Sequence, residues 1–588
     1  MVQKKATLKD SFIEALQNYK KRNFERAEVL CNKILSIDNT HLESKILLAN
    51  IAAKKTNFLL AKQLLMEAID IQPNNVIVLN NLGTACKHLG ELKNAGTYYK
   101  KVIEIDPNNT NAYYNLGATC YDLKQLNEAK KYLQKTTSLQ PDFALPFFVL
   151  GNVYKDLKEY DRAISSYQKA IEINNDLVSA HNNLGLVFRT LNDFKNAIKC
   201  YEKAIEIKND HVGARHNLAL ALKESGKFNE AIISHQQAIK YEPENLAHYY
   251  YLSDLKKDIL DKNLKEKIVN IIKKNNVKKI NAAYGNYLLS KYEQKEKNHE
   301  KELNFLIKGH ELYFDSRKDA FEIMVKYNFQ DMLQISNELT LEKSSKKNSS
   351  KIRPIFIIGV PRCGSTLVEK IIASGSKYVP MGEETAVLEE YITAQILKKR
   401  SLNLGERKII EEEISNIYKQ RGLISEKFNN MFTDKSLNNF FYLNFINEIF
   451  PNAKIINCKR NTLSSIMSIF QNHLSELAWA HDLDNIFKYF DNYFSAMKKY
   501  EMTNTNSIYH LDFEKLVNSP EEESKKIMKF CELPWDKKCL EFYKRKDLIS
   551  KTASNIQIRK SIYKHTSEKY SPYKKFLQKY GEKYSWFN

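Results

Sequence analysis

Cysteine is sparse in this chain and never occurs in closely spaced pairs. The eight cysteines among 588 residues lie far apart, and no Cys-x-x-Cys motif is present. No cluster of Cys and His has the spacing of a zinc site. The pattern predicts reduced thiols in the core of a cytoplasmic protein, and it predicts no metal site.

Long apolar runs are absent as well. No stretch of the sequence is long and apolar enough to form a transmembrane helix, which needs about 20 mostly apolar residues. The N-terminal residues Met-Val-Gln-Lys-Lys lead into a polar amphipathic segment that lacks the apolar stretch of a signal peptide. We therefore expect a cytoplasmic protein without a membrane span.

Acidic residues are outnumbered, with 70 Asp and Glu against 91 Lys and Arg, which gives a net charge of +21. The basic residues are scattered instead of forming a tail or a stripe, and no nucleic-acid-binding module is apparent. A nucleic-acid role would rest on charge alone, so we expect none. An anionic cofactor or an acidic substrate fits the charge equally well.

What the chain does contain is a repeat with a period of 34 residues between about residues 8 and 245. One alanine per unit marks it through seven units: Ala27, Ala61, Ala95, Ala129, Ala163, Ala197 and Ala231. Two antiparallel helices pack closely where the side chain is this small, and a period of 34 is typical of the tetratricopeptide repeat. The sequence predicts an α-solenoid over residues 8–245 with a concave groove.

Four of the repeats carry an asparagine at the same place, namely Asn81, Asn115, Asn183 and Asn217. An amide side chain both donates and accepts hydrogen bonds, as a peptide unit does. The column resembles the ladder with which the tetratricopeptide superhelix of O-GlcNAc transferase holds an extended peptide. The resemblance implies a polypeptide partner in the repeat groove. Asparagine is common in this chain and also caps turns, so an ordinary structural role stays open.

The repeat register fades after residue 245. We interpret residues 246–341 as a degenerate repeat and helical connector, because helical apolar spacing persists there. Residues 342–351 are polar and lack apolar side chains, which is typical of a linker, and we place the linker at residues 342–352. A second domain is expected over residues 353–588.

The second domain opens on a strand, a tight turn and a helix. The apolar run 355–358 suits a buried strand, and Gly359 and Gly364 follow with the spacing of a phosphate-binding P-loop. Ser365 stands where such a loop has its lysine, and Arg362 supplies a cation from inside the loop instead. A helix that begins at such a turn favours an anion. An ordinary strand-to-helix turn is the alternative.

This loop resembles the one with which sulfotransferases bind 3′-phosphoadenosine 5′-phosphosulfate (PAPS). The resemblance implies an α/β P-loop-like domain with a central parallel sheet, with PAPS as co-substrate and no metal. It also implies that Arg362, Cys363, Gly364, Ser365 and Thr366 hold the 5′-phosphosulfate.

Residues 382–385 have the sequence Gly-Glu-Glu-Thr. This segment resembles the tyrosylprotein sulfotransferases, which have the same four residues at the corresponding place. The resemblance implies that Glu384 is the general base that deprotonates the acceptor hydroxyl. It also implies that Lys435, in Phe-Thr-Asp-Lys-Ser, stabilises the departing phosphate oxygen. Animal enzymes continue with an arginine that contacts acidic substrates, whereas this chain has Ala386, so the acceptor preference is open.

The remaining matches concern the nucleotide. Arg460 follows a predicted strand and Ser468 comes eight residues later, the spacing with which sulfotransferases bind the 3′-phosphate. Ser554 matches a serine near the sulfate and Lys569 matches a phosphate-binding basic residue. Phe513 replaces the usual tyrosine. The matches imply a PAPS-dependent sulfotransferase, with tyrosine in a polypeptide as the expected acceptor.

Two alternatives stay open at this point. The acceptor could be a carbohydrate or a small hydroxyl compound instead of a tyrosine. The chain could also be a non-catalytic tetratricopeptide scaffold whose second domain has decayed, and the departures at Ala386 and Phe513 are compatible with that.

Overall fold

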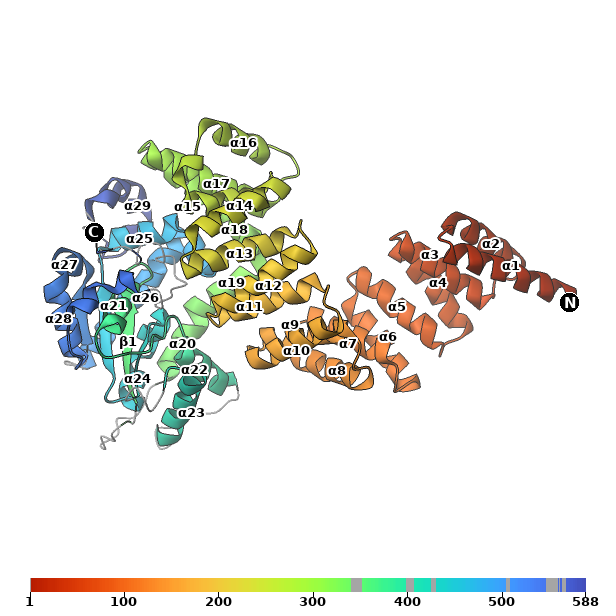
Figure 1. Cartoon of the computed structure of the whole chain (residues 1–588), viewed down its shortest axis with the longest axis horizontal. Coiled ribbons are helices and arrows are strands. Elements are labelled where there is room, and N and C mark those ends of the chain that lie inside the picture. Colours follow the sequence, from red (N-terminus) through yellow and green to blue (C-terminus); the bar gives the residue numbers. More distant parts are fainter. Residues whose placement is uncertain are drawn as a thin grey trace. The chain divides into compact units, whose positions relative to one another are not determined.

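The computed structural model describes residues 2–339, 350, 352–397, 407–424, 430–503, 508–545, 559, 561–562 and 567–587. The chain divides into two compact units, Met1–Ala221 and Leu222–Asn588. Figure 1 shows their helices and strands along the chain. The segment boundaries that we expect from the sequence remain a prediction.

The first unit is made of helix pairs that repeat along the chain. The helices are α1 (Val2–Lys20), α2 (Phe24–Ile37), α3 (Leu42–Lys54), α4 (Phe58–Ile71), α5 (Val76–His88), α6 (Leu92–Ile105), α7 (Thr110–Asp122), α8 (Leu126–Leu139), α9 (Ala144–Asp156), α10 (Tyr160–Ile173), α11 (Val178–Thr190), α12 (Phe194–Ile207) and the larger part of α13 (Val212–Ser225). The marker alanines are buried in the second helix of each pair. The predicted α-solenoid is confirmed.

Glycine in the first helix of a repeat allows a close approach to the second helix. A β-carbon at Gly151 would lie 2.6 Å from the ring of Tyr167, and one at Gly185 would lie 2.7 Å from the ring of Tyr201. Both tyrosines are fully buried. The glycine at these two positions is therefore explained by the tyrosine ring that packs over it.

Part of the asparagine content is explained by helix capping. Asn57, Asn75 and Asn109 each precede a helix and accept hydrogen bonds from backbone N–H groups of its first turn. These groups have no partner within the helix, so an amide oxygen at this position stabilises the helix start.

The second unit begins with further helices. They are the end of α13, α14 (Phe228–Tyr241), α15 (Leu246–Leu255), α16 (Lys262–Ile272), α17 (Lys279–Lys295), α18 (His299–Asp315), α19 (Lys318–Lys326) and α20 (Met332–Glu338), with a π-helical turn at Tyr327–Asp331. Tyr287 and Leu306 of these helices belong to the same apolar core as Ile357 and Ile456 of the sheet. The connector helices and the sheet therefore form one packed body.

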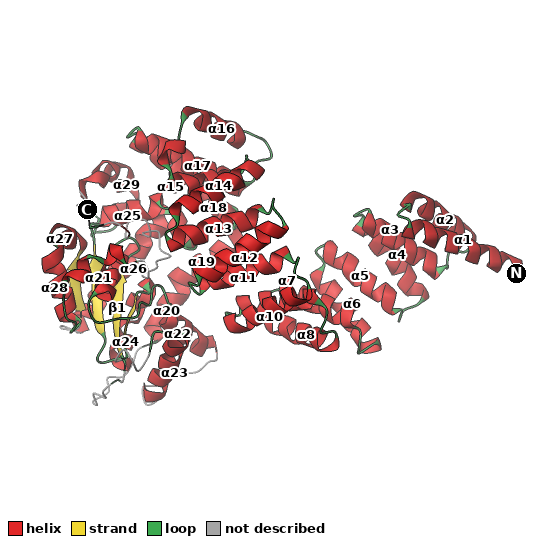
Figure 2. Ribbon diagram, viewed as in Figure 1, coloured by secondary structure: helices red, strands yellow, loops and turns green. Residues whose placement is uncertain are grey.

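A four-stranded sheet forms part of the second unit and is drawn in yellow at the left of Figure 2. The strands are β1 (Arg353–Gly359), β2 (Met431–Asp434), β3 (Lys454–Lys459) and β4 (Ile508–Asp512). All neighbours are parallel, and the order is β2-β1-β3-β4. Residues 355–358 are fully buried, as a strand covered on both faces requires. The predicted α/β domain with a central parallel sheet is confirmed.

Helices connect and cover the strands, as parallel pairing requires. They are α21 (Ser365–Ser374), α22 (Val387–Leu397), α23 (Arg407–Gln420), α24 (Leu443–Ile449), α25 (Thr462–Gln471), α26 (Leu483–Thr503), α27 (Phe513–Asn518), α28 (Pro520–Phe530) and α29 (Lys574–Gly581). Because all strands run the same way, the segments that follow them meet at one edge of the sheet, where open α/β sheets bind ligands. Among the described helices, none has the length and apolarity to cross a bilayer.

Candidate functional site

A cavity of about 1070 Å³ lies at this edge of the sheet, within the second unit. Its walls include most of the residues that the sequence singles out: Arg362, Gly364, Ser365, Thr366, Glu384, Lys435, Arg460, Ser468 and Lys569. They come from segments that lie up to about 200 residues apart in the chain. The fold therefore gathers the expected donor-binding and catalytic side chains around one space.

The loop after β1 is tied to the segment after β3. Arg362 has a left-handed backbone, with φ 68°, and its Nε donates a hydrogen bond of 3.0 Å to Ser468 Oγ. Arg460 Nη1 donates to the Arg362 carbonyl oxygen at 2.9 Å. The two segments expected to bind opposite ends of the nucleotide are thus fixed to each other, and both arginines line the cavity.

The side chain of Cys363, within this loop, is buried and does not line the cavity. It is fully buried, and its Sγ lies 2.7 Å from where a β-carbon of Gly359 would be. A hydrogen bond with the Cys458 thiol lowers the pKa of Cys363 and raises that of Cys458. Its thiol therefore faces β3, and its backbone alone remains for a ligand.

Lys435 follows β2 and is the buried cation of the site. Its side chain is 1% exposed, and its Nζ lies 3.3 Å from Glu384 Oε1 and 3.6 Å from Glu383 Oε1. Burial lowers the pKa of Lys435, but the carboxylates of Glu384, Glu383 and Glu369 together outweigh burial and raise it above its usual value. Lys435 is therefore charged at any physiological pH. The side chain of Glu384 is 54% exposed, as access to an acceptor requires.

The turn that carries Glu384 is strained and is held from several sides. Glu384 and Ala386 both have φ 51°, in the left-handed region that disfavours residues with a β-carbon. Backbone bonds from Lys435 N–H to the Gly382 carbonyl, at 2.9 Å, and from Ala386 N–H to Ser436 Oγ, at 2.8 Å, fix its two ends. Arg421 donates to the Thr385 carbonyl oxygen.

Sequence reasoning missed three charged residues beneath the site. Asp434 is fully buried and accepts hydrogen bonds from Tyr418, Ser436, Asn439 and Thr385. Glu369 and Lys370 lie on α21, just after the donor loop, and are also buried. Burial raises the pKa of Glu369 to about 7 and lowers that of Lys370 to about 8. In the sequence, Glu369 and Lys370 stand among mostly apolar residues, but this pattern does not show that their side chains face inward.

The connector helices form a second wall of the cavity, which no motif in the sequence predicts. Tyr250, Tyr251 and Asp254 of α15 line it, together with Lys291 of α17. Lys291 Nζ lies 2.6 Å from Asp254 Oδ1 and 4.1 Å from the centre of the Tyr250 ring. This wall is aromatic and polar, and it shares the space with the donor loop.

The C-terminal segment completes the cavity. Lys569 lines it, and Tyr570 beside it is buried. Tyr573 donates a hydrogen bond of 2.5 Å to Glu302 Oε2 of α18, which anchors this segment to the connector helices. Ser554, which the resemblance places near the sulfate, lies outside the described residues.

The asparagine column lies in the first unit, and three of its members bond to asparagines of a neighbouring repeat. The Nδ2 groups of Asn81, Asn183 and Asn217 donate to the Oδ1 atoms of Asn50, Asn152 and Asn182 at 3.0, 2.8 and 3.0 Å. Asn115 is half-buried like the others. The column therefore links repeats, and its role in peptide binding stays a prediction.

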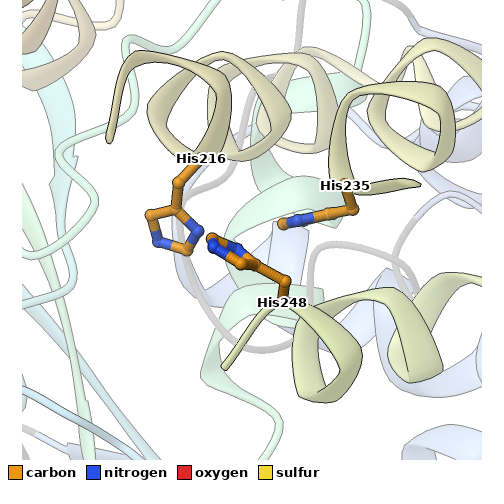
Figure 3. A group of neighbouring side chains, drawn as sticks. All are labelled: His216, His235 and His248. Carbon is orange, nitrogen blue, oxygen red and sulfur yellow. The ribbon is translucent and has the colours of Figure 1, made fainter. Parts of the chain in front are cut away.

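One histidine group has the composition of a metal site. Nitrogen atoms of His216, His235 and His248 lie within 4.8 Å of one another (Figure 3). His235 stacks on Tyr251, and His248 Nε2 lies 3.6 Å from a Glu242 carboxylate oxygen. None of the three is among the described residues that line the cavity, so the chemistry around Lys435 does not draw on them.

Comparison with known families agrees with this architecture. A family model described as "Sulfotransferase family" matches residues 354–537. Models described as "TPR repeat" match residues 83–123 and 151–190, and those described as "Tetratricopeptide repeat" match 110–143, 178–211 and 212–245. The chain therefore carries tetratricopeptide repeats and a sulfotransferase-family domain, which confirms the resemblance seen in the sequence.

Two curated proteins are similar over part of their length. An uncharacterized protein of Aquifex aeolicus (strain VF5) is 31% identical over 321 residues, which is 51% of this chain and 41% of that protein. Protein-tyrosine sulfotransferase A of Caenorhabditis elegans is 24% identical over 277 residues, covering 42% of this chain and 67% of that protein. The chain thus spans about two fifths of the first relative and two thirds of the second.

Some solved structures are similar to part of the chain. The crystal structure of MamA protein is 30% identical, with a TM-score of 0.27, over 29% of this chain and 93% of that one. YrrB, described as a TPR protein with an unusual peptide-binding site, is 21% identical, with a TM-score of 0.28, over 32% of this chain and 96% of that one.

Proposed function

We propose that the protein transfers the sulfuryl group of PAPS to the hydroxyl group of a tyrosine in a polypeptide. The observation that carries the proposal is the pair formed by Lys435 and Glu384, 3.3 Å apart on the wall of the cavity that the Arg362 loop also lines. A buried cation beside an accessible carboxylate supplies the two groups that this transfer needs, a stabiliser for the leaving oxygen and a base.

The donor would bind along the loops at the carboxyl edge of the sheet. Backbone N–H groups at the start of α21 and the Arg362 guanidinium suit the 5′-phosphosulfate. Arg460 and Ser468 suit the 3′-phosphate, and they already lie beside Arg362. Lys569 adds a further cation to the cavity. The arrangement offers separate cations for the two charged ends of PAPS.

The proposed reaction is an in-line displacement at sulfur. Glu384 takes the proton of the acceptor hydroxyl while its oxygen bonds to sulfur. The bond between sulfur and the bridging phosphate oxygen breaks, and Lys435 neutralises the charge that develops on that oxygen. Ser554 assists at the same oxygen. The products are a sulfate ester and 3′-phosphoadenosine 5′-phosphate (PAP), and the step needs no metal.

The acceptor is proposed from three features. The strand and loop motifs resemble a protein-tyrosine sulfotransferase, to which the chain is similar over 42% of its length. The column formed by Asn81, Asn115, Asn183 and Asn217 suits an extended polypeptide. The wall formed by Tyr250, Tyr251 and Lys291 leaves space for an acceptor beside the donor loop. All eight cysteines are free thiols, which supports the proposal that the protein is cytoplasmic.

Transfer of labelled sulfate from PAPS tests the proposal. Tyrosine peptides are offered as acceptors, with sugars as competitors. We expect Glu384→Gln and Lys435→Met to lower kcat by roughly 100-fold or more, because each removes a group that acts in the transition state. Glu383→Gln is the matched control: it removes the neighbouring carboxylate, 3.6 Å from Lys435, and should keep activity within about tenfold.

Three results would contradict parts of the proposal. Unchanged turnover in the Glu384 or Lys435 variant removes that residue from the mechanism. Competition by sugars but not by tyrosine peptides indicates a carbohydrate acceptor. Tight PAP binding without any transfer favours the non-catalytic scaffold.

A further inference from the structure

A buried carboxylate lies directly behind the donor loop. Glu369 is on α21, three residues after Thr366, and its side chain is fully buried. Its Oε1 accepts a hydrogen bond of 2.7 Å from Thr433 Oγ1, whereas its Oε2 has no hydrogen-bond partner among the described residues. A buried carboxylate oxygen without a donor makes the ionised form costly, so a proton on this oxygen is favoured.

The charges that face Glu369 come from three segments. Lys435 follows β2, Glu383 belongs to the turn before α22, and Lys370 is the next residue of α21. At the far end of α21, next to Gly375, lie Met528 of α28 and Cys539 of the turn Lys537–Leu540, and Arg545 Nη1 donates a hydrogen bond of 2.8 Å to the Ala373 carbonyl oxygen.

Lys435 has to compensate more carboxylates than one ammonium group can neutralise. It contacts Glu384 and Glu383 and also acts on the charge of Glu369. Burial outweighs the attraction of Lys435 and sets the pKa of Glu369 at about 7, so the group is partly ionised at neutral pH. An anion placed against Lys435 adds negative charge and draws on the same ammonium group. This raises the cost of an ionised Glu369 further.

We propose that Glu369 is a positioning residue of the donor site that takes up a proton when PAPS or PAP binds. The inference rests on the proposed donor. The proton comes from solvent and adds to a Glu369 carboxylate oxygen. Lys435 is then released from one of its carboxylate partners and stays oriented toward the anionic ligand.

The hydrogen bonds around Glu369 are compatible with both charge states. Gly382 N–H donates to Thr433 Oγ1 at 3.1 Å, and the Thr433 hydroxyl donates onward to Glu369 Oε1. A proton on Oε2 leaves this chain intact. The turn that carries Glu384 begins at Gly382, so Glu369 holds it in place before and after protonation.

The test is isothermal titration calorimetry of the full chain with PAP, in two buffers of different ionisation enthalpy. At pH 7.5 we expect uptake of about half a proton per PAP bound. Bound PAP raises the pKa of Glu369, so PAP binds more tightly when Glu369 is protonated. The affinity for PAP is therefore highest below the pKa of Glu369 in the free protein and falls as the pH rises above it. The fall should be roughly threefold per pH unit between pH 7 and 8.5.

Two variants assign the proton. Glu369→Gln keeps an acceptor for Thr433 but removes the titration, so PAP should still bind and the uptake should fall close to zero. Glu523→Gln is the control: this carboxylate of α28 is also buried, lies 2.7 Å from Lys526 and does not line the cavity, and it should leave the uptake unchanged. If Glu369→Gln does not fold, Glu369→Asp retains a carboxyl group and should shift the pH profile.

The outcomes separate this inference from the proposed function. PAP binding by the wild type without proton uptake overturns the inference alone. Uptake that persists in Glu369→Gln, or a pH profile unchanged in Glu369→Asp, also overturns it. No binding of PAP by the wild type at any pH overturns the donor assignment and this inference with it.

Discussion

The residue type at Gly364 in the donor loop is determined by its backbone conformation and by its neighbour Phe513. A β-carbon at Gly364 would lie 2.2 Å from a ring carbon of Phe513, and its φ of 96° is unfavourable for any side chain. The Phe513 ring in turn lies beneath the Arg460 guanidinium, at 4.9 Å. Phe513, which departs from the expected tyrosine, therefore packs against both proposed phosphate-binding segments.

Gly364→Ala should disturb the donor site through this contact. We expect PAP affinity to fall by about tenfold or more and the free energy of unfolding to fall by roughly 1–3 kcal/mol, because the loop must move away from Phe513. Calorimetry with PAP and thermal melting measure the two effects. Gly422→Ala is the matched control, since Gly422 has φ 72° but no atom within 4 Å of its added carbon. Equal loss of PAP affinity in both variants would contradict the role of Phe513.

The sequence was informative for the residues of the site that stand in short motifs. Arg362, Glu384, Lys435 and Arg460 were found because each follows or lies near a strand in a recognisable order. Glu369 was not, because nothing in a local window shows that a glutamate in a helix faces inward beside a lysine more than 60 positions away.

At the scale of elements, the turn 382–386 is the part of the site under strain. Its left-handed residues persist because β2 and α23 hold it, and Arg421 at the end of α23 also pairs with Glu390 of α22. The strand β2 itself is only four residues long. The sequence therefore indicated its motif but gave too little periodicity to indicate a strand.

Arg421→Ala should loosen the turn without emptying the donor site. We expect kcat to fall about tenfold while the KM for PAPS stays within about twofold, because Glu384 loses its fixed position and the donor loop does not. Stability should change by less than about 1 kcal/mol, since the Arg421–Glu390 pair is partly exposed. Steady-state kinetics check this, with exposed Lys419→Ala of the same helix as control. A matching fall in PAP affinity would contradict it.

At the scale of the whole chain, the repeat period predicted the solenoid because a small residue at every thirty-fourth position leaves few other folds. The part played by residues 246–341 was not predictable in the same way. Their helices share one apolar core with the sheet and supply a wall of the cavity. Such a role depends on contacts between distant segments, which helical periodicity does not encode.

Lys291→Met tests whether this wall meets the acceptor. We expect the KM for a tyrosine peptide to rise about tenfold and the affinity for PAP to stay within about twofold, because Lys291 contacts Tyr250 and Asp254 of the connector wall. Lys279→Met, an exposed lysine of the same helix paired with Asp315, is the control. If Lys291→Met changes the affinity for PAP more than the KM for the peptide, the wall contacts the donor instead of the acceptor.

The two walls of the cavity would contribute differently to the selectivity of an inhibitor. One wall is built from the loops of a sulfotransferase-family domain, and a nucleotide mimic that fills it would meet groups suited to PAPS in general. The other is built from Tyr250, Tyr251, Asp254 and Lys291 of the connector. A compound that joins a bisphosphate to an aromatic group reaching this second wall would gain its selectivity for this protein there.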